Sequence, residues 1–199
     1  MVGYPSLQLY VLLVADIYQG GFWDFTSNLS FKDTAYTSEA IGPHTDNTYF
    51  TDPARLQLFH LLSHTDGSGG ETVMVDGFEA AKKLYEEYPR AIYPLIKYPQ
   101  PFHSSGNEDV CIQPVLQAPV FSAMPRSKEL YQIRWNNYDR GPKTDWSYEE
   151  QSEWYGAARY FNELVNHASL QMWYRLQPGT ALSKSACIHN FFFFFYLND

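Results

Sequence analysis

The segment LQLFHLLSHTDGSGGETVMVDGFEAAKKLYEEYPR, residues 56–90, carries the pattern on which the fold prediction rests. Apolar runs at Leu56–Leu62 and Glu71–Val75 stand on either side of the cluster Thr65–Gly70, which is rich in glycine. This order predicts two strands separated by a turn. Asp76 can then cap a helix that stops at Pro89. One face of that helix is apolar and carries Phe78, Ala81, Leu84, Tyr85 and Tyr88.

A second helix is predicted further along the chain. Ser147 and Glu150 have the spacing of a capping box. Apolar residues follow at helical intervals: Trp154, Ala157, Ala158, Phe161, Leu164, Val165 and Ala168. The remaining β-like segments are short, and they are Ile112–Leu116, Glu129–Trp135 and Leu170–Leu176. Many short strands with a few inserted helices predict a mainly β fold, a double-stranded β-helix (jelly roll) decorated with helices.

Composition limits the classes of function. The chain has 199 residues, the length of one domain, and its formal net charge is −8. An acidic chain is not expected to bind nucleic acid or an anionic membrane surface, because both require clustered Lys and Arg. The two cysteines, Cys111 and Cys187, are too few for a disulfide scaffold or a four-cysteine zinc site, so a reducing compartment is expected.

The two ends differ from the body of the chain. Residues 1–19 form a divergent N-terminal segment with a short apolar run, Leu7–Val14, which lacks the features of a signal peptide, a transit peptide or a membrane span. A cytoplasmic or mitochondrial protein is therefore expected. Residues 183–199 contain five consecutive phenylalanines, Phe191–Phe195, without any period of a helix or a strand. We interpret this segment as an aberrant tail from translated non-coding sequence; the alternative is a buried C-terminal strand.

His44-Thr45-Asp46 is the first candidate for chemistry. On an extended segment His44 and Asp46 project to the same face, and an imidazole with a carboxylate forms two thirds of the facial triad of non-haem Fe(II) enzymes. Taken alone, the motif is more often a surface turn. The same three residues recur as His64-Thr65-Asp66, which runs into the glycine-rich cluster and is assigned to a turn without metal.

Several motifs in order resemble those of a known family. The segment 20–78, with DTAYT (33–37), HTD (44–46) and GGET (69–72), and the segment 129–140, with RWNNYDR (134–140), are similar to the clavaminate-synthase-like family of Fe(II)/2-oxoglutarate oxygenases, which includes taurine dioxygenase. The resemblance is closest to the branch that contains trimethyllysine dioxygenase and γ-butyrobetaine dioxygenase. It covers residues 20–182, which we expect to form one incomplete oxygenase domain with the jelly-roll fold.

The resemblance implies a role for particular residues. His44 and Asp46 match two iron ligands, and Thr72 matches a threonine that holds 2-oxoglutarate. Trp23 and Tyr36 match aromatic residues that cage a trimethylammonium group, a cation that ring faces attract, although alone they would be assigned to an ordinary core. The remaining substrate-binding candidates are Asp33, near that cage, and the amide pair Asn136 and Asn137, for which the alternative is a turn.

The chain departs from the family pattern after Pro178-Gly179. The family continues with a strand that bears the third iron ligand, followed by an arginine that grips 2-oxoglutarate. Here no arginine follows Arg175, and the one downstream histidine, His189, lies two positions out of register. The third metal ligand is therefore unknown, and His189 is not expected to supply it. The closing strands of the jelly roll are expected to be missing.

Three hypotheses can be compared on the basis of these inferences. The first is an Fe(II)- and 2-oxoglutarate-dependent dioxygenase that hydroxylates N6,N6,N6-trimethyllysine in carnitine biosynthesis, crippled by truncation, with O₂ as cosubstrate and ascorbate as reductant. Its partner would be a small quaternary-ammonium amino acid, and the resemblance leaves a homodimer open. The second is an inactive fragment or pseudoenzyme, or an enzyme similar to γ-butyrobetaine dioxygenase. The third, a β-domain that never bound metal, is disfavoured by the ordered motifs.

Overall fold

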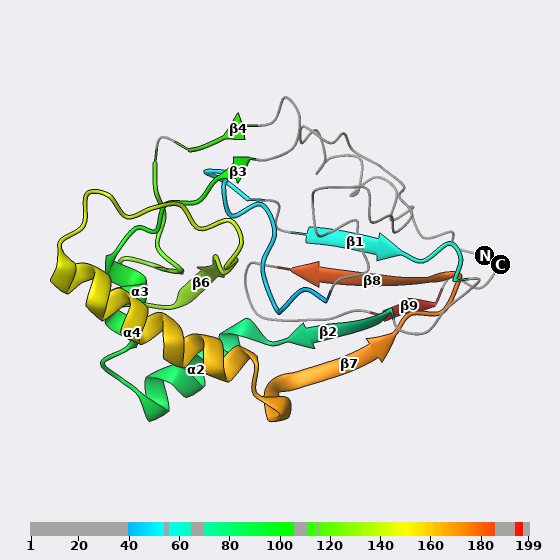
Figure 1. Cartoon of the computed structure of the whole chain (residues 1–199). Helices are drawn as coiled ribbons and strands as arrows, with labels where there is room; N and C mark the ends of the chain where they lie inside the picture. The colour runs from blue at the N-terminus through cyan, green and yellow to red at the C-terminus, as the bar shows by residue number, and fades with distance from the viewer. Residues whose placement is uncertain are drawn as a thin grey trace.

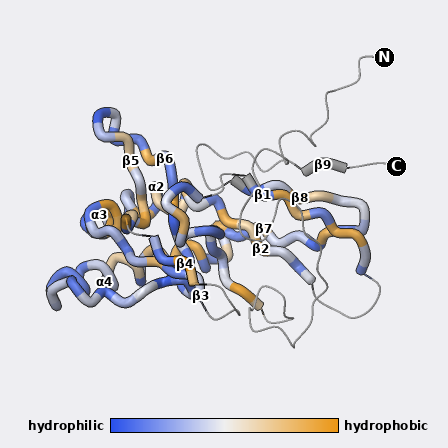
Figure 2. Tube along the Cα trace, turned by 90° about the horizontal axis from the view of Figure 1, so that it is seen from above, coloured by the Kyte–Doolittle hydropathy of each residue, from blue (hydrophilic) through white to orange (hydrophobic). Residues whose placement is uncertain are grey.

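The structure is a computed structural model that describes residues 40–53, 56–64, 70–105, 111–114, 116–185 and 194–196. Three helices lie at one end of the molecule and the longer strands at the other, as two perpendicular views show (Figures 1 and 2). The helices are α2 (Gly77–Glu87), α3 (Ile92–Lys97) and α4 (Tyr148–Val165), with a 3-10 turn at Ala168–Leu170. The strands are β1 (Leu56–His60), β2 (Glu71–Val75), β3 (Ser104–Ser105), β4 (Cys111–Ile112), β5 (Phe121–Ala123), β6 (Leu130–Ile133), β7 (Gln171–Arg175), β8 (Thr180–Ser185) and β9 (Phe194–Tyr196).

Strand β8 lies between β1 and β9, and both pairings are antiparallel. A tight turn sets its register: Gly179, in the left-handed region at φ +82°, donates its N–H to the Leu61 carbonyl over 2.9 Å. Pairing with β1 runs from His60 opposite Ala181 to Leu56 opposite Ser185. The strand therefore continues across the boundary that the sequence placed after Leu182, and β9 pairs with its first half.

Strands β2 and β7 form a second antiparallel ribbon, in which Thr72 lies opposite Tyr174. The prediction for β2 is confirmed residue for residue, and β7 falls within its predicted segment. The prediction of a strand at Ile112–Leu116 is wrong apart from Ile112, because β4 ends there. Pro114 has no N–H to continue a ladder, which accounts for the early end.

Both predicted helices are confirmed together with their caps. The carboxylate of Asp76 accepts hydrogen bonds from the N–H groups of Phe78 (2.9 Å) and Glu79 (3.0 Å) at the start of α2. At α4, Glu150 N–H donates to the Ser147 hydroxyl over 3.2 Å, and Ser147 N–H donates to the Glu150 carboxylate over 2.9 Å. No helix within the described ranges has the length and apolar character needed to cross a membrane.

The hydrophobic core lies where the three helices meet β5 and β6. Phe161 of α4 is 1% exposed and packs edge-on against both Phe121 and Trp135, with ring centres 4.9 Å away in each case. Burying a side chain of this size contributes roughly 1.5–3 kcal/mol. The largest fully buried side chains are Trp154, Phe121, Phe161, Leu84, Leu95, Gln100 and Val120.

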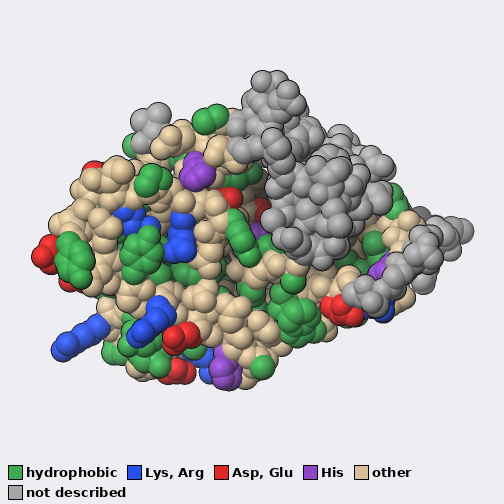
Figure 3. Space-filling model, in the orientation of Figure 1, with side chains coloured by type: hydrophobic (Ala, Val, Ile, Leu, Met, Phe, Trp, Pro, Cys, Tyr) green, Lys and Arg blue, Asp and Glu red, His purple; other side chains and the backbone are tan. Residues whose placement is uncertain are grey.

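A lysine is enclosed by aromatic rings beside α4. The Lys143 ammonium lies 4.1 Å from the ring centre of Trp154 and 4.6 Å from that of Tyr155, and it donates to the Tyr155 hydroxyl over 3.3 Å. Such ring faces attract a cation. Burial, with the nearby Arg140 charge, nevertheless lowers the pKa of Lys143 to about 8. Basic side chains gather among hydrophobic ones over this helical end of the molecule (Figure 3).

Candidate functional site

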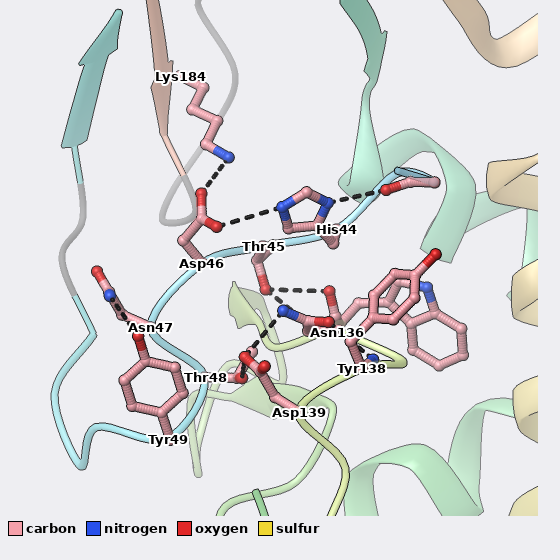
Figure 4. A network of polar contacts seen from close by, with 12 residues as sticks. His44, Thr45, Asp46, Asn47, Thr48, Tyr49, Asn136, Tyr138, Asp139 and Lys184 are labelled. Atoms are coloured by element: carbon pink, nitrogen blue, oxygen red, sulfur yellow. Dashed lines mark hydrogen bonds and ion pairs between the residues drawn. The ribbon is translucent and has the colours of Figure 1, made fainter. Parts of the chain in front are cut away.

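His44 and Asp46 lie side by side on a loop without helix or strand, between residues 40 and 53. His44 Nε2 is 3.2 Å from Asp46 Oδ1 (Figure 4). His44 Nδ1 lies 2.8 Å from the Gly42 carbonyl oxygen, which can only accept, so Nδ1 carries the proton of that bond. This fixes the ring with Nε2 turned toward the carboxylate. The predicted pair is therefore brought together.

Lys184 of β8 completes the cluster. Its ammonium donates to Asp46 Oδ2, so the two oxygens of the carboxylate face two different basic side chains (Figure 4). The same ammonium lies 5.5 Å from the ring centre of Phe59 on β1. The sequence-based prediction missed Lys184, because it assigned residues 183–199 to an aberrant tail. The apolar residues Ala181 and Leu182 directly after the Pro-Gly turn were the signal that a strand continues there.

The charges in this cluster stabilise one another. Burial raises the pKa of Asp46, but the hydrogen bond from His44 and the charge of Lys184 outweigh it, and the pKa falls well below its usual range. Burial lowers the pKa of His44, and the Asp46 hydrogen bond and charge outweigh that effect, so its pKa is raised. Asp46 is therefore a carboxylate, the form that binds metal ions and ammonium groups.

The backbone of Thr45, between His44 and Asp46, is hydrogen-bonded to Trp135, two residues after the end of β6. Thr45 N–H donates to the Trp135 carbonyl over 2.7 Å, and Trp135 N–H donates to the Thr45 hydroxyl over 2.9 Å. Directly after Asp46, Asn47 adopts φ +58°, a left-handed conformation that asparagine tolerates. The chain turns there, and Phe50 N–H bonds to the Asn47 carbonyl over 3.0 Å. The loop is thus held on both sides of the His-Thr-Asp motif.

Asp139 links the loop that carries His44 and Asp46 to the segment after β6. Its Oδ2 accepts from the Thr48 hydroxyl (3.0 Å) and from the Asn136 amide (2.8 Å), as Figure 4 shows. Burial, with a contribution from the Asp46 charge, raises the pKa of Asp139, although the Thr48 bond acts in the opposite direction. Asn136 is buried, whereas Asn137 is exposed and donates to Asn162 of α4 over 3.1 Å. The Asn136 amide therefore contacts Asp139 beside the His44 loop, whereas the Asn137 amide contacts α4 at the surface.

The other predicted site residues are placed as follows. Thr72 is half-buried on β2, and within the described part of the chain it makes no hydrogen bond to His44 or Asp46. His64, in the segment after β1, lies 3.4 Å from a guanidinium nitrogen of Arg175 on β7. The substrate-binding candidates Trp23, Asp33 and Tyr36, and the histidine His189, lie outside the described residues.

The donors at this site fit an Fe(II) ion in part. The imidazole of His44 and the carboxylate of Asp46 are the ligand types that a facial triad uses. Across the described ranges, however, no group of three or more His, Cys, Asp or Glu side chains is placed to hold a metal ion. The described residues therefore offer two side chains of the types that such a triad uses, and Lys184 places a cation on the same carboxylate.

The comparisons with known proteins agree with one another, since each match is to a dioxygenase. The model of the "Taurine catabolism dioxygenase TauD, TfdA family" matches residues 15–183. A trimethyllysine dioxygenase of Meyerozyma guilliermondii is 40% identical over 183 residues, 90% of this chain and 45% of the relative. A mitochondrial trimethyllysine dioxygenase of Bos taurus is 38% identical over 86% of this chain and 41% of the relative. The human γ-butyrobetaine dioxygenase is 25% identical over 83% of this chain. The chain spans less than half the length of these relatives.

Proposed function

Since this chain belongs to the TauD, TfdA family of dioxygenases, we propose that it carries part of an Fe(II)- and 2-oxoglutarate-dependent oxygenase whose substrate is trimethyllysine. The observation that carries the proposal is the adjacency of His44 and Asp46, 3.2 Å apart, in a chain that is 40% identical to a trimethyllysine dioxygenase. The more distant match to γ-butyrobetaine dioxygenase, at 25% identity, makes that substrate the weaker candidate.

His44 and Asp46 would hold the metal through Nε2 and a carboxylate oxygen. Bound there, Fe(II) with 2-oxoglutarate and O₂ would supply the oxidising chemistry, and ascorbate would keep the metal reduced. The chain's own contribution is orientation. The Gly42 carbonyl fixes the His44 ring, and the Thr45–Trp135 bonds hold the backbone between the two ligands. Preorganisation of this kind lowers the cost of binding a metal at a loop.

The remaining roles are proposals on the same basis. Thr72 would contact 2-oxoglutarate, and Trp23, Tyr36 and Asp33 would surround the quaternary ammonium group of the substrate. Asn136 and Asn137 would contact the substrate, Asn136 held by its bond to Asp139 and Asn137 by its bond to Asn162 of α4. The ribbons β1–β8–β9 and β2–β7 would belong to a jelly roll, and a mitochondrial location would follow that of the bovine relative.

A second candidate is a protein that occupies the same site without turnover. The specific observation in its favour is that the described residues offer two metal ligands and place Lys184 on one of them. This candidate and the oxygenase make the same prediction for binding at His44 and Asp46, and they differ in succinate formation from 2-oxoglutarate. Succinate formed in a trimethyllysine-dependent manner would exclude the second candidate.

Anaerobic titration of the full chain with Fe(II) tests the proposed ligands. His44→Ala and Asp46→Ala should each abolish binding, because each removes one of two donors. His64→Ala is the matched control, since it removes the histidine of the duplicated His-Thr-Asp motif and should leave binding unchanged. Equal loss from all three variants would contradict the assignment.

A further inference from the structure

Both oxygens of the Asp46 carboxylate are already engaged. His44 Nε2 lies 3.2 Å from Oδ1, and the Lys184 ammonium donates to Oδ2. The Asp46 and Lys184 side chains are 32% and 29% exposed, so the pair is partly shielded from water. Opposite charges that are partly removed from water attract each other more strongly than a fully exposed pair.

The strand register determines why this lysine reaches Asp46. Lys184 pairs with Gln57 across the β1–β8 ladder, and Leu182 pairs with Phe59. Side chains two positions apart on a strand share a face, so Lys184 and Phe59 are diagonal neighbours on the same side. The 5.5 Å distance from the ammonium to the Phe59 ring centre agrees with this arrangement. The backbone pairing and the ring together hold the ammonium at the carboxylate.

We infer that Lys184 is an internal cation that competes with a divalent metal for Asp46. This inference rests on the proposed role of His44 and Asp46 as metal ligands. A protonated lysine has three donors and no lone pair, so it cannot itself bind the metal. A dication that approaches Asp46 has to displace the ammonium from Oδ2, and until that happens the two positive charges repel each other. Lys184 therefore weakens metal binding and holds the carboxylate in place when no metal is bound.

Metal affinity of the full chain tests the inference without relying on turnover. Lys184→Met keeps all but the last atom of the side chain's length and removes its charge, and it should tighten Mn(II) binding about tenfold. The concentration of free Mn(II) is measured from its electron paramagnetic resonance signal under anaerobic conditions. Lys184→Arg keeps a cation at the position and should bind Mn(II) as weakly as the unmodified chain. Equal affinity of Lys184→Met and the unmodified chain would overturn the inference.

Lys82→Met is the matched control. It removes the same charge from an ion pair with a carboxylate, since Lys82 lies 3.4 Å from Glu79 on α2, away from the site. It should leave the affinity for Mn(II) unchanged. A tenfold gain in Lys82→Met as well would assign the effect to net charge and overturn the role of Lys184. Circular dichroism and thermal unfolding establish that each variant is folded.

Additional variants separate a failure of this inference from a failure of the proposed function. His44→Ala is introduced into the unmodified chain and into Lys184→Met, and it should abolish binding in both. If Lys184→Met changes nothing and His44→Ala still abolishes binding, the competition is refuted and the metal site stands. If binding persists in His44→Ala, or if neither the unmodified chain nor Lys184→Met binds Mn(II), the proposed metal site and the competition at it are both refuted.

Discussion

Thr45 and Trp135, 90 positions apart, are joined by two reciprocal hydrogen bonds and by a third, from the Thr45 hydroxyl to the Trp135 carbonyl over 3.4 Å. The loop residue donates its N–H to the Trp135 carbonyl, and its hydroxyl accepts the Trp135 N–H. Trp135 is 5% exposed and packs edge-on against Phe161 of α4. The candidate metal ligands on either side of Thr45 are therefore anchored, through one tryptophan, to the hydrophobic core.

Replacing Thr45 by Val should destabilise the fold by about 1–2 kcal/mol, because the backbone N–H of Trp135 loses its acceptor while it stays partly buried. Thr45→Ser keeps the hydroxyl and should recover most of the free energy of unfolding. Urea unfolding followed by tryptophan fluorescence measures both. A Val variant as stable as the unmodified chain would show that the hydrogen bonds of the Thr45 hydroxyl contribute nothing.

Asn47 should tolerate Gly and resist Ala. Its φ of +58° lies in the left-handed region, where a Cβ costs roughly 1 kcal/mol and glycine has none. Asn47→Ala is therefore expected to unfold at lower urea than Asn47→Gly. The two variants lose the same side-chain amide, so their difference isolates the backbone conformation. The reverse order of stability would contradict the left-handed turn after Asp46.

Ser147→Ala should lower stability by about 1 kcal/mol, because it removes the acceptor for the Glu150 N–H at the start of α4. Ser152→Ala serves as control: it makes the same chemical change at an exposed position inside the helix, where alanine favours the helix. Thermal unfolding should therefore shift downward for the first variant only. Matching shifts would mean that the capping box does not stabilise α4.

Lys143 should make stability depend on pH in the alkaline range. Its pKa is about 8 in the folded protein, against 10.5 for an unperturbed lysine, so the unfolded chain binds more protons between these values. The free energy of unfolding should therefore gain a rising contribution from pH 8 to 10.5. Lys143→Met should lack that contribution.

The quantity to measure is the difference in the free energy of unfolding between the unmodified chain and Lys143→Met at several pH values. Taking the difference removes the contributions that both proteins share. Lys82→Met provides the control, because it removes the same charge from an exposed lysine on α2. A difference that stays constant from pH 7 to 10.5 would show that Lys143 is not perturbed by its buried position.

The helices could be predicted from the sequence because their signals are local. Asp76, Ser147 and Glu150 act within one turn of the residues that they cap, and the apolar period marks the buried face of α4. On α2 it is wrong for Tyr85 and Tyr88, which are exposed. Helix α3 was not predicted from the sequence, since six residues are too few to show an apolar period and one of them is Pro94. It occupies the first turn of that helix, where the N–H that proline lacks has no partner within the helix.

The candidate site could be predicted in part for the same reason. His44 and Asp46 are two positions apart, so their adjacency follows from local geometry and is confirmed. Lys184 reaches Asp46 across 138 positions, and Asp139 reaches Thr48 across 91, through pairings that no local pattern encodes. The roles of Thr72, Asn136 and Asn137, and those of Trp23, Asp33 and Tyr36, stay predictions.

The turn that begins β8 makes the site sensitive to insertions and deletions. Gly179 and Thr180 are tied to Leu61 by two backbone hydrogen bonds, so the count of residues from this turn decides which side chains of β8 face Asp46. Adding or removing one residue between Thr180 and Lys184 would send Lys184 to the opposite face of the strand and bring a neighbour to its place. A single codon gained or lost there would exchange a charged residue for a small neutral one, Ser183 or Ser185, without altering His44 or Asp46.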